Sequence, residues 1–410
     1  MRPFAYAASQ LGVQVRRLIL VVASVATLAG VTAFAGAAQA APSSNGALHS
    51  HKRVCDVAPT GRAACDALVV TDATTGRPLA TTGYASGYSP NQLTTAYGPF
   101  GSGAPTVAVI DAYANPAAVT DLAVYRKQFG LASADLTQVN QTGGPISTVA
   151  GDIGWGQEEM LDLEMVSAVC PGCKLLYVGA NSASFSDLAA AVTTAKNMGA
   201  AVISNSYGGS EFRGETSLTD WNISGVAVTV SAGDNGYGAE FPAASAGAIA
   251  VGGTSLNLSS TGVRSSETAW SGSGSGCSAY VSKPSWQHDT GCTRRTVADI
   301  AAVADPNTGV AVYDSYGSTG DADWYVFGGT SVAAPLVGAI YARDGIPTTG
   351  SGYPVQAAYA NAGKLYDVTS GSNGTCTTSR SKTGAYLCAG SRGYDGPTGN
   401  GAPNGSPQPF

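Results

Sequence analysis

Residues 106–111 read TVAVID, a continuous apolar and β-branched run that is typical of a strand buried on both faces of a sheet. Residues 117–129 repeat at helical spacing, and KLLYVG at 174–179 is again a strand. A helix expected over 185–198 then leads into AVISNS at 201–206. This alternation predicts an α/β fold in which a parallel sheet carries helices on both faces.

The alternation continues beyond that strand. VAVTVS at 226–231 and a short run at 249–253 are two more expected strands, with a helical stretch expected near 219–224. In open parallel sheets, sites form at the carboxyl ends of the strands. Asp111 and Ser206 each close one of these strands, so we expect both at that edge of the sheet.

Size and composition limit the function classes. The chain has 410 residues, of which 44% are apolar and only 12% are charged, so it can bury a large core. Its formal net charge of −6 and its pI near 5.0 argue against a nucleic-acid partner, which would require a basic surface.

The N-terminus has the features of an export signal. Two arginines at 16 and 17 precede an apolar run over 18–40 that ends in Ala38-Gln39-Ala40, a small-x-small cleavage pattern. A membrane anchor is the alternative, but Ser, Thr and Gly interrupt the run, so we expect residues 1–40 to be removed. The remaining chain is expected to be secreted, without a membrane partner.

Two regions should follow the signal peptide. Residues 41–85 are polar and show little periodicity, which suggests a short pro-segment or an N-terminal arm. Residues 86–410 are expected to form one domain. We see no internal repeat in them.

The cysteines support export. There are eight, and they fall into four close pairs: Cys55/Cys65, Cys170/Cys173, Cys277/Cys292 and Cys376/Cys388. An even number at local spacings in a secreted chain favours disulfides between neighbours. The Cys170-Pro171-Gly172-Cys173 motif could instead be a redox or zinc half-site, but no second CxxC accompanies it.

A candidate nucleophile lies in Gly328-Gly329-Thr330-Ser331-Val332-Ala333-Ala334-Pro335. Ser331 follows two glycines and precedes an apolar run over 333–341 that is expected to be a helix. Glycine allows a sharp turn and close approach of a substrate chain, and a helix N-terminus favours negative charge on an attacked carbonyl. A serine that merely caps a buried helix is the alternative.

A nucleophilic serine needs a base, and histidine is scarce. Of the three histidines, His49 and His51 lie in the 41–85 segment, and His288 lies in a loop where we expect it to be solvated. Without a histidine at hand, a carboxylate would have to accept the proton of Ser331.

The segment 156–166 (GQEEMLDLEMV) offers such carboxylates. Its apolar residues recur at helical spacing, which predicts an amphipathic helix with Glu158 and Asp162 on a shared face. A partly buried pair of this kind shares a proton, which raises the pKa of one member. Glu159 and Glu164 are expected to be solvated, although Glu159 paired with Asp162 is an alternative.

The turn Ser231–Gly236 (SAGDNG) supplies a further candidate. Asp234 could be a turn former that accepts hydrogen bonds. If it is protonated, it could instead donate a hydrogen bond to an oxyanion.

Taken together, these motifs resemble the sedolisin family of serine-carboxyl peptidases, which have a subtilisin-like fold. Gly328–Pro335 is similar to its GTSxxxP nucleophile segment, Glu158-x-x-x-Asp162 to its base and orienting acid, and Ser231–Gly236 to its SxGDxG turn. The resemblance implies that Ser331 is the nucleophile, Glu158 the base, Asp162 its orienting partner and Asp234 the oxyanion donor.

The resemblance also implies one calcium ion. Asp367-Val368-Thr369 and the Gly-rich 390–400 stretch are similar to the calcium loop of the family. The implied ligands are the side chains of Asp367 and Asp395 and the carbonyl oxygens of Val368, Ser391 and Gly393. Oxygen ligands suit this hard cation.

The resemblance therefore implies a secreted, monomeric serine-type endopeptidase that acts on proteins or peptides at acidic pH. Residues 41–85 are too few for the large prodomain of the family, which leaves an inactive binding protein on a peptidase fold as the alternative. A subtilisin using Asp111 lacks a usable histidine, and a nucleophile-elbow esterase lacks GxSxG.

Overall fold

The computed structural model describes residues 49–318, 323–346, 352–376 and 382–405. The expected signal peptide lies outside the described residues. Among those that are described, no helix is both long and apolar enough to cross a membrane.

The core is a sheet of eight strands. Seven of them follow the order β12-β11-β9-β7-β4-β6-β5, and β15 pairs with β11. Their bounds are β4 Thr106–Ala112, β5 Asp135–Asn140, β6 Lys174–Ala180, β7 Val202–Asn205, β9 Ala227–Ser231, β11 Ile249–Leu258, β12 Arg264–Ala269 and β15 Ile300–Val303. All neighbouring pairs are parallel except β11 with β12. The predicted α/β fold with a parallel sheet is confirmed.

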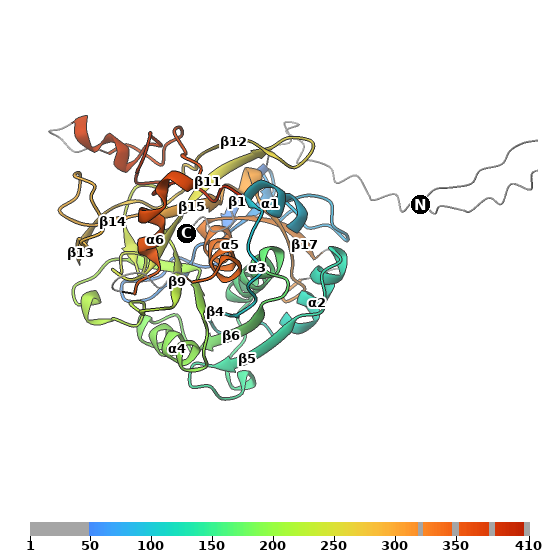
Figure 1. Ribbon diagram of the computed structural model, residues 1–410. Helices are drawn as coiled ribbons and strands as arrows, with labels where there is room; N and C mark the ends of the chain where they lie inside the picture. The colour runs from blue at the N-terminus through green and yellow to red at the C-terminus, as the bar shows by residue number, and fades with distance from the viewer. Residues whose placement is uncertain (1–48, 319–322, 347–351, 377–381, 406–410) are drawn as a thin grey trace, which may run out of the picture. The chain divides into compact units, whose positions relative to one another are not determined.

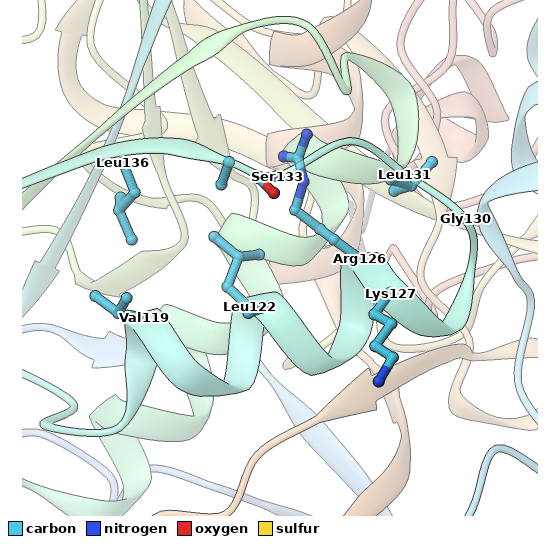
Figure 2. Close-up of a pocket in the computed structure, with 10 residues that line it drawn as sticks. Val119, Leu122, Arg126, Lys127, Gly130, Leu131, Ser133 and Leu136 are labelled. Atoms are coloured by element: carbon cyan, nitrogen blue, oxygen red, sulfur yellow. The ribbon is translucent and has the colours of Figure 1, made fainter.

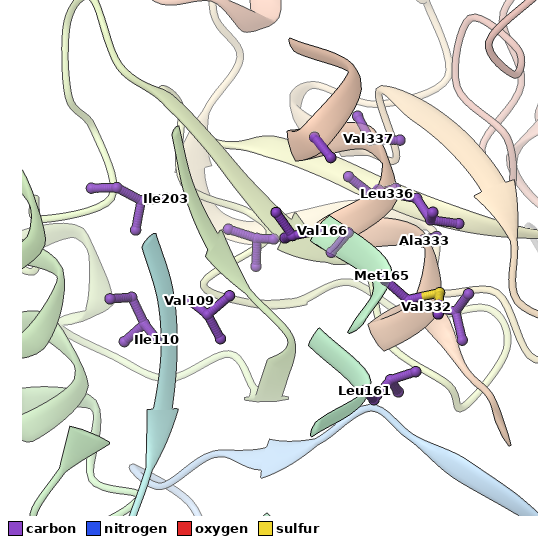
Figure 3. Packing of buried hydrophobic residues seen from close by; sticks show 14 of the residues in the cluster. Val109, Ile110, Leu161, Met165, Val166, Ile203, Val332, Ala333, Leu336 and Val337 are labelled. Atoms are coloured by element: carbon purple, nitrogen blue, oxygen red, sulfur yellow. The ribbon is translucent and has the colours of Figure 1, made fainter. Parts of the chain in front are cut away.

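Helices cover both faces of this sheet. Their bounds are α1 Pro90–Tyr97, α2 Ala118–Gln128, α3 Ile153–Val169, α4 Phe185–Asn197, α5 Thr330–Asp344 and α6 Val355–Ala360. In Figure 1, α3 and α5 lie together on one face and α4 lies on the other. Figure 3 shows the apolar side chains of this region, among them Leu161 and Val166 of α3 with Val332 and Leu336 of α5.

Three smaller sheets surround the core. A four-stranded sheet has the order β1-β3-β17-β16, a three-stranded sheet the order β10-β8-β2, and β13 pairs with β14. Their bounds are β1 His49–Arg53, β2 Ala64–Cys65, β3 Leu68–Asp72, β8 Tyr207–Ser210, β10 Glu240–Phe241, β13 Gly276–Ser282, β14 Arg294–Val297, β16 Val310–Tyr313 and β17 Trp324–Gly328. The N-terminal arm thus contributes strands to two of these sheets.

Two sequence-based expectations about helices are wrong. The helix expected near 219–224 is replaced by turns, because Trp221 is fully buried against Phe241 and its indole N–H donates to Asn205. Helix α3 is not amphipathic, because every residue from Trp155 to Val169 is buried except Gln157, which is half-buried.

The two glutamates expected to be solvated on α3 are therefore fully buried. Glu159 accepts a hydrogen bond from the Asn115 backbone N–H at 2.6 Å, and Glu164 accepts one from that of Tyr313 at 3.0 Å. These backbone N–H groups supply hydrogen bonds that water would have supplied if the two side chains were exposed, as the sequence pattern had suggested.

The cysteine pairing is confirmed. All four neighbouring pairs, Cys55/Cys65, Cys170/Cys173, Cys277/Cys292 and Cys376/Cys388, form disulfides, and no free cysteine remains. The zinc or redox reading of Cys170 and Cys173 is therefore not needed.

Candidate active site

Ser331 lies in the first turn of α5 and is fully buried. Gly329 caps this helix with φ of 103°, a conformation that glycine adopts readily, and so turns the chain from β17 into the helix. The Ser331 hydroxyl donates to the Ser206 carbonyl oxygen at 3.1 Å, and its backbone N–H donates to the Asp66 carbonyl oxygen at 3.0 Å.

Helix α3 packs against α5 and carries Glu158 towards this serine. Both Glu158 oxygens are buried and lack a hydrogen bond of ordinary geometry within the described chain. Burial raises the pKa of Glu158 well above its usual range, and the charges of Asp162 and Asp111 raise it further. The nearby Ser331 hydroxyl lowers this pKa, although in this structure the hydroxyl is bonded to Ser206.

Asp162, one turn further along α3, links the helix to Ser206, which lies between β7 and β8 and whose carbonyl oxygen accepts the Ser331 hydroxyl. Its Oδ1 accepts a hydrogen bond from the Ser206 hydroxyl at 2.7 Å, and Oδ2 has no partner in the described residues. Burial raises the pKa of Asp162, and the charge of Asp111 adds to the effect. The structure thus brings Glu158 and Asp162 together beside Ser331.

Asp111 completes a three-carboxyl cluster that the sequence did not predict. It lies near the end of β4, it is fully buried, and within the described chain neither of its oxygens is hydrogen-bonded. Burial raises its pKa strongly. Because three such groups influence one another, the cluster holds protons collectively instead of each group titrating alone.

Asp234 follows β9 and reaches the start of α5. Its Oδ1 accepts hydrogen bonds from the Thr330 backbone N–H at 2.7 Å and the Thr330 hydroxyl at 2.9 Å. Its Oδ2 is buried without a partner among the described residues, and burial raises the pKa of Asp234 to about 7 despite the two bonds from Thr330.

The free oxygen of Asp234 lies beside the Asp66 carbonyl. A Cβ built on Gly329 would lie 2.6 Å from Asp234 Oδ2 and would overlap the Asp66 carbonyl oxygen. Both oxygens therefore lie next to the same side of Gly329. In its protonated form Asp234 can therefore offer a proton to a carbonyl held there by the Ser331 N–H.

Histidine takes no part in this constellation. His49, His51 and His288 are all exposed, as the sequence suggested for His288. All three side chains therefore lie at the surface, whereas Asp111 is fully buried, so the structure does not support a histidine-based triad with Asp111.

The expected calcium loop brings its two aspartates near one another. Asp395 is buried and accepts the Ser391 N–H at 2.9 Å, while the exposed Asp367 accepts the Gly393 N–H at 3.1 Å. Burial raises the pKa of Asp395 to about 7, and the charge of Asp367 contributes. A cation between the two would relieve this repulsion, so the residues fit the ion.

A general search gives no further metal site. In the described part of the chain, no group of three or more His, Cys, Asp or Glu side chains is placed to hold a metal. The candidate calcium set, which combines two carboxylates with backbone carbonyls, is not a group of that kind.

One pocket of the molecule borders the candidate active site and another lies away from it. A cavity of about 460 Å³ is bordered by Asp234, Leu68 and Trp270, next to the Asp66 carbonyl. Figure 2 shows another, of about 690 Å³, between α2 and the segment leading into β5. Its lining includes Leu122 and Arg126 and none of the residues around Ser331.

Sequence reasoning missed Asp66 entirely and underrated Asp111. Asp111 had a signal, since it ends a buried strand at the edge where sites form. Asp66 had none, because its place beside Ser331 depends on pairing between segments far apart in the chain.

Comparison with known proteins identifies the family of this chain. The subtilase family model matches residues 147–373. Sedolisin from Pseudomonas sp. (strain 101) is 30% identical over 373 residues, covering 78% of this chain and 60% of sedolisin. Kumamolisin from Bacillus sp. (strain MN-32) is 30% identical over 328 residues, covering 70% of this chain and 56% of kumamolisin.

The chain thus spans less than two thirds of the length of these relatives. A solved structure of Pseudomonas sedolisin, a serine-carboxyl proteinase complexed with two molecules of pseudo-iodotyrostatin, is similar with a TM-score of 0.66 and 28% identity. That similarity covers 78% of this chain and 96% of the solved chain, and it confirms the subtilisin-like fold.

Proposed function

Because this chain belongs to the subtilase family, and within it to the sedolisins, we propose that it is a serine-type endopeptidase that hydrolyses proteins or peptides in acid. The observation that carries the proposal is the buried Glu158 beside the Ser331 hydroxyl, in a chain whose three histidines are all exposed.

In the proposed mechanism, Glu158 in its ionised form takes the proton of Ser331 as the hydroxyl oxygen attacks the substrate carbonyl. Before this step, a rotation of the serine side chain turns its O–H away from the Ser206 carbonyl oxygen and towards a carboxylate oxygen of Glu158. Asp162, held by the Ser206 hydroxyl, orients Glu158 and shares its proton.

The oxyanion is bound by two donors, the Ser331 backbone N–H and protonated Asp234. Glu158 then returns its proton to the leaving amine and activates the water that releases the acyl-enzyme. Only the neutral form of Asp234 donates, and its pKa is about 7. The need for a neutral Asp234 therefore makes activity fall as the pH passes 7.

The remaining expectations are part of the same proposal. One structural calcium ion would be held by Asp367 and Asp395 with the carbonyls of Val368, Ser391 and Gly393, where it would tie the late Gly-rich loop to the domain. Residues 1–40 would direct secretion, and four disulfides suit an oxidising compartment. The mature enzyme would act as a monomer.

The test compares two neighbouring buried glutamates on α3. Glu158→Gln is expected to lower kcat about 10²–10⁴-fold, the range for loss of a general base. Glu159→Gln is the matched control, since Glu159 is equally buried but bonds to Asn115 and Gln138 instead of neighbouring Ser331. Initial rates on an unfolded protein at pH 4 give the result.

Equal losses in the two variants would show that burial, not base chemistry, explains the effect. If the unaltered protein has no peptidase activity between pH 3 and 8, the alternative of an inactive binding protein on this fold takes its place. Ser331→Ala serves as the blank in both cases.

A further inference from the structure

A third pocket, of about 410 Å³, lies between the 215–222 segment, β10 and β13. Its volume falls within the range of small-molecule sites. Leu218, Phe241, Tyr280 and Val281 give it apolar walls, and Glu215 lines it among them. We call it the Glu215 pocket.

Strand β10 separates this pocket from the candidate active site. Successive side chains of a strand point to opposite faces. Glu240 points towards the candidate active site, since a Cβ on Gly233, the residue before Asp234, would lie 2.8 Å from the Glu240 carboxyl carbon. Phe241, the next residue of β10, lines the Glu215 pocket instead. The pocket therefore lies on the other side of β10 from Asp234.

Glu215 is a buried acid with one unused oxygen. The residue has no exposed surface. Its Oε2 accepts the Phe212 backbone N–H at 2.8 Å, whereas Oε1 lacks a hydrogen bond of ordinary geometry within the described chain. Buried polar atoms are rarely left in this state unless a water, an ion or a ligand supplies the missing partner. The unused Oε1 therefore points to a donor that enters the pocket.

The charged side chain that acts on Glu215 is a second carboxyl, that of Glu211. Burial and then Glu211 raise the pKa of Glu215 to about 8, although the Phe212 N–H lowers it. Glu211 accepts the Ser278 hydroxyl at 2.5 Å and the Ala279 backbone N–H at 2.8 Å, which fixes it to β13, one wall of the pocket. Two acids beside one pocket favour a positively charged ligand.

The arginines of the neighbouring strand β14 are engaged with other groups. Arg294 donates to the Tyr280 carbonyl oxygen at 2.8 Å, and Arg295 pairs with the buried Asp299 at 2.6 Å. Glu215 takes part in no ion pair within the described residues. A cation for Glu215 would therefore come from outside the chain.

The polar part of the pocket suits an ammonium group better than a guanidinium group. A guanidinium binds best to both oxygens of a carboxylate, but Glu215 Oε2 already accepts the Phe212 N–H. An ammonium needs only one carboxylate oxygen and has two further N–H groups to place. Thr216 and Ser282 also line the pocket, and their hydroxyl oxygens are acceptors.

The apolar part of the pocket suits a short alkyl chain. Lysine side chains bury a four-carbon stem against apolar surface while the charged end keeps polar partners. Leu218 and Phe241 offer such a surface here, and Tyr280, which is 37% exposed, extends it to the molecular surface. The pocket thus joins an apolar wall to a single unused carboxyl oxygen.

We propose that the Glu215 pocket binds a primary alkylammonium group, either the side chain of a lysine in a polypeptide or a free amine, with the charge at Glu215 Oε1 and the stem against Leu218 and Phe241. This site lies apart from Ser331, and its existence does not depend on the proposed peptidase function.

Binding should weaken in acid. The ammonium group requires the ionised form of Glu215, and below its pKa of about 8 this carboxyl holds a proton that the ligand has to displace. Each pH unit below that value should therefore lower the affinity about tenfold. The pocket would hold its ligand at neutral or higher pH and release it in acid.

The test is a ligand-observed NMR titration of the unaltered chain with n-butylammonium chloride. At pH 9 we expect a Kd on the order of 1 mM, which is reasonable for so small a ligand, and at pH 7 a value about tenfold higher. n-Butanol has the stem without the charge, and methylammonium has the charge without the stem. Each should bind about tenfold more weakly or worse.

Two variants test the two parts of the site. Glu215→Gln should weaken n-butylammonium binding about tenfold at pH 9 and abolish its pH dependence, because the carboxyl charge is gone. Tyr280→Ala, at an exposed wall position, should weaken n-butylammonium but not methylammonium. The control is Glu159→Gln, another fully buried glutamate, which lies on α3 and should bind as the unaltered chain does. Equal Tm values report that the variants fold.

Nα-acetyl-lysine N-methylamide separates the two sources of the ammonium group. If it binds about as tightly as n-butylammonium, the pocket takes lysine side chains of polypeptides; if only n-butylammonium binds, the pocket takes free amines. The inference is wrong if n-butanol binds as tightly as n-butylammonium, if Glu215→Gln keeps the affinity and its pH dependence, or if none of the ammonium probes binds at pH 9.

Discussion

At the scale of single residues, Asp234 makes the chemistry at Ser331 depend on pH. Its pKa is raised to about 7 by burial, so below that value it is neutral and can donate from Oδ2. Above it, the carboxylate would repel an oxyanion. An aspartate side chain can donate a hydrogen bond only while its carboxyl group is protonated, and a raised pKa keeps it protonated.

Asp234→Asn should extend activity towards neutral pH. The amide Nδ2 donates at every pH, so the fall in kcat/KM near pH 7 should move upward, while Asp234→Ala should lose about 10²–10³ in kcat through loss of one oxyanion donor. A pH–rate profile of both variants provides the measurement. An unchanged upper limb in Asp234→Asn would mean that another group sets it.

At the scale of elements, α3 owes its position to the burial of its residues from Trp155 onward between neighbouring elements. Leu161 has no exposed surface, whereas Ile153, at the start of the same helix, is 52% exposed. Leu161→Ala should lower the free energy of unfolding by about 2–5 kcal/mol, and Ile153→Ala should change it by no more than about 0.5 kcal/mol. Urea denaturation of both variants tests this, and similar values would contradict the packing described for α3.

The candidate calcium loop is an element whose order should depend on the ion. With calcium at about 100 times its Kd, the ion should add about 2.7 kcal/mol, and a chelator should remove it. Asp395→Asn should abolish the calcium-dependent rise in Tm. The control is Asp305→Asn, another loop carboxyl bonded to a hydroxyl and a backbone N–H. A calcium response that survives in Asp395→Asn would place the ion elsewhere.

At the scale of the whole molecule, the many buried carboxyls tie stability to acid. Burial raises the pKa values of Asp234 and Asp314 to about 7 and of Glu215 to about 8. In the unfolded chain these groups titrate near 4. Between about pH 4 and 8 the folded state therefore binds more protons than the unfolded state, and stability must fall as pH rises.

The Tm should accordingly be higher at pH 4 than at pH 8, with a difference of about 2–4 °C for each kcal/mol lost. Asp314→Asn removes one of these titrations and should flatten the decline, whereas Asp56→Asn, at an exposed position, should not. Calorimetry across this range is the measurement. A Tm that rises towards pH 8 would contradict the assignment of raised pKa values.

The sheet and the disulfides were predicted correctly from the sequence, whereas the surroundings of the candidate site were predicted only in part. The strands from Thr106 and Lys174 and the helix from Phe185 were predictable because their patterns are local. The burial of Glu159 and Glu164 was not, because helical spacing counts neighbours along one helix and takes no account of other elements packed around it.

The sequence by itself determined which residue types could do chemistry: a serine after two glycines, carboxylates one helical turn apart, and no histidine where a base is needed. Only the tertiary structure decided which carboxyls share a dry environment with that serine, since burial, and with it a raised pKa, depends on the elements packed around a group. It alone decided that Asp66 lies against Ser331, because strand pairing between distant segments leaves no periodic trace in either one.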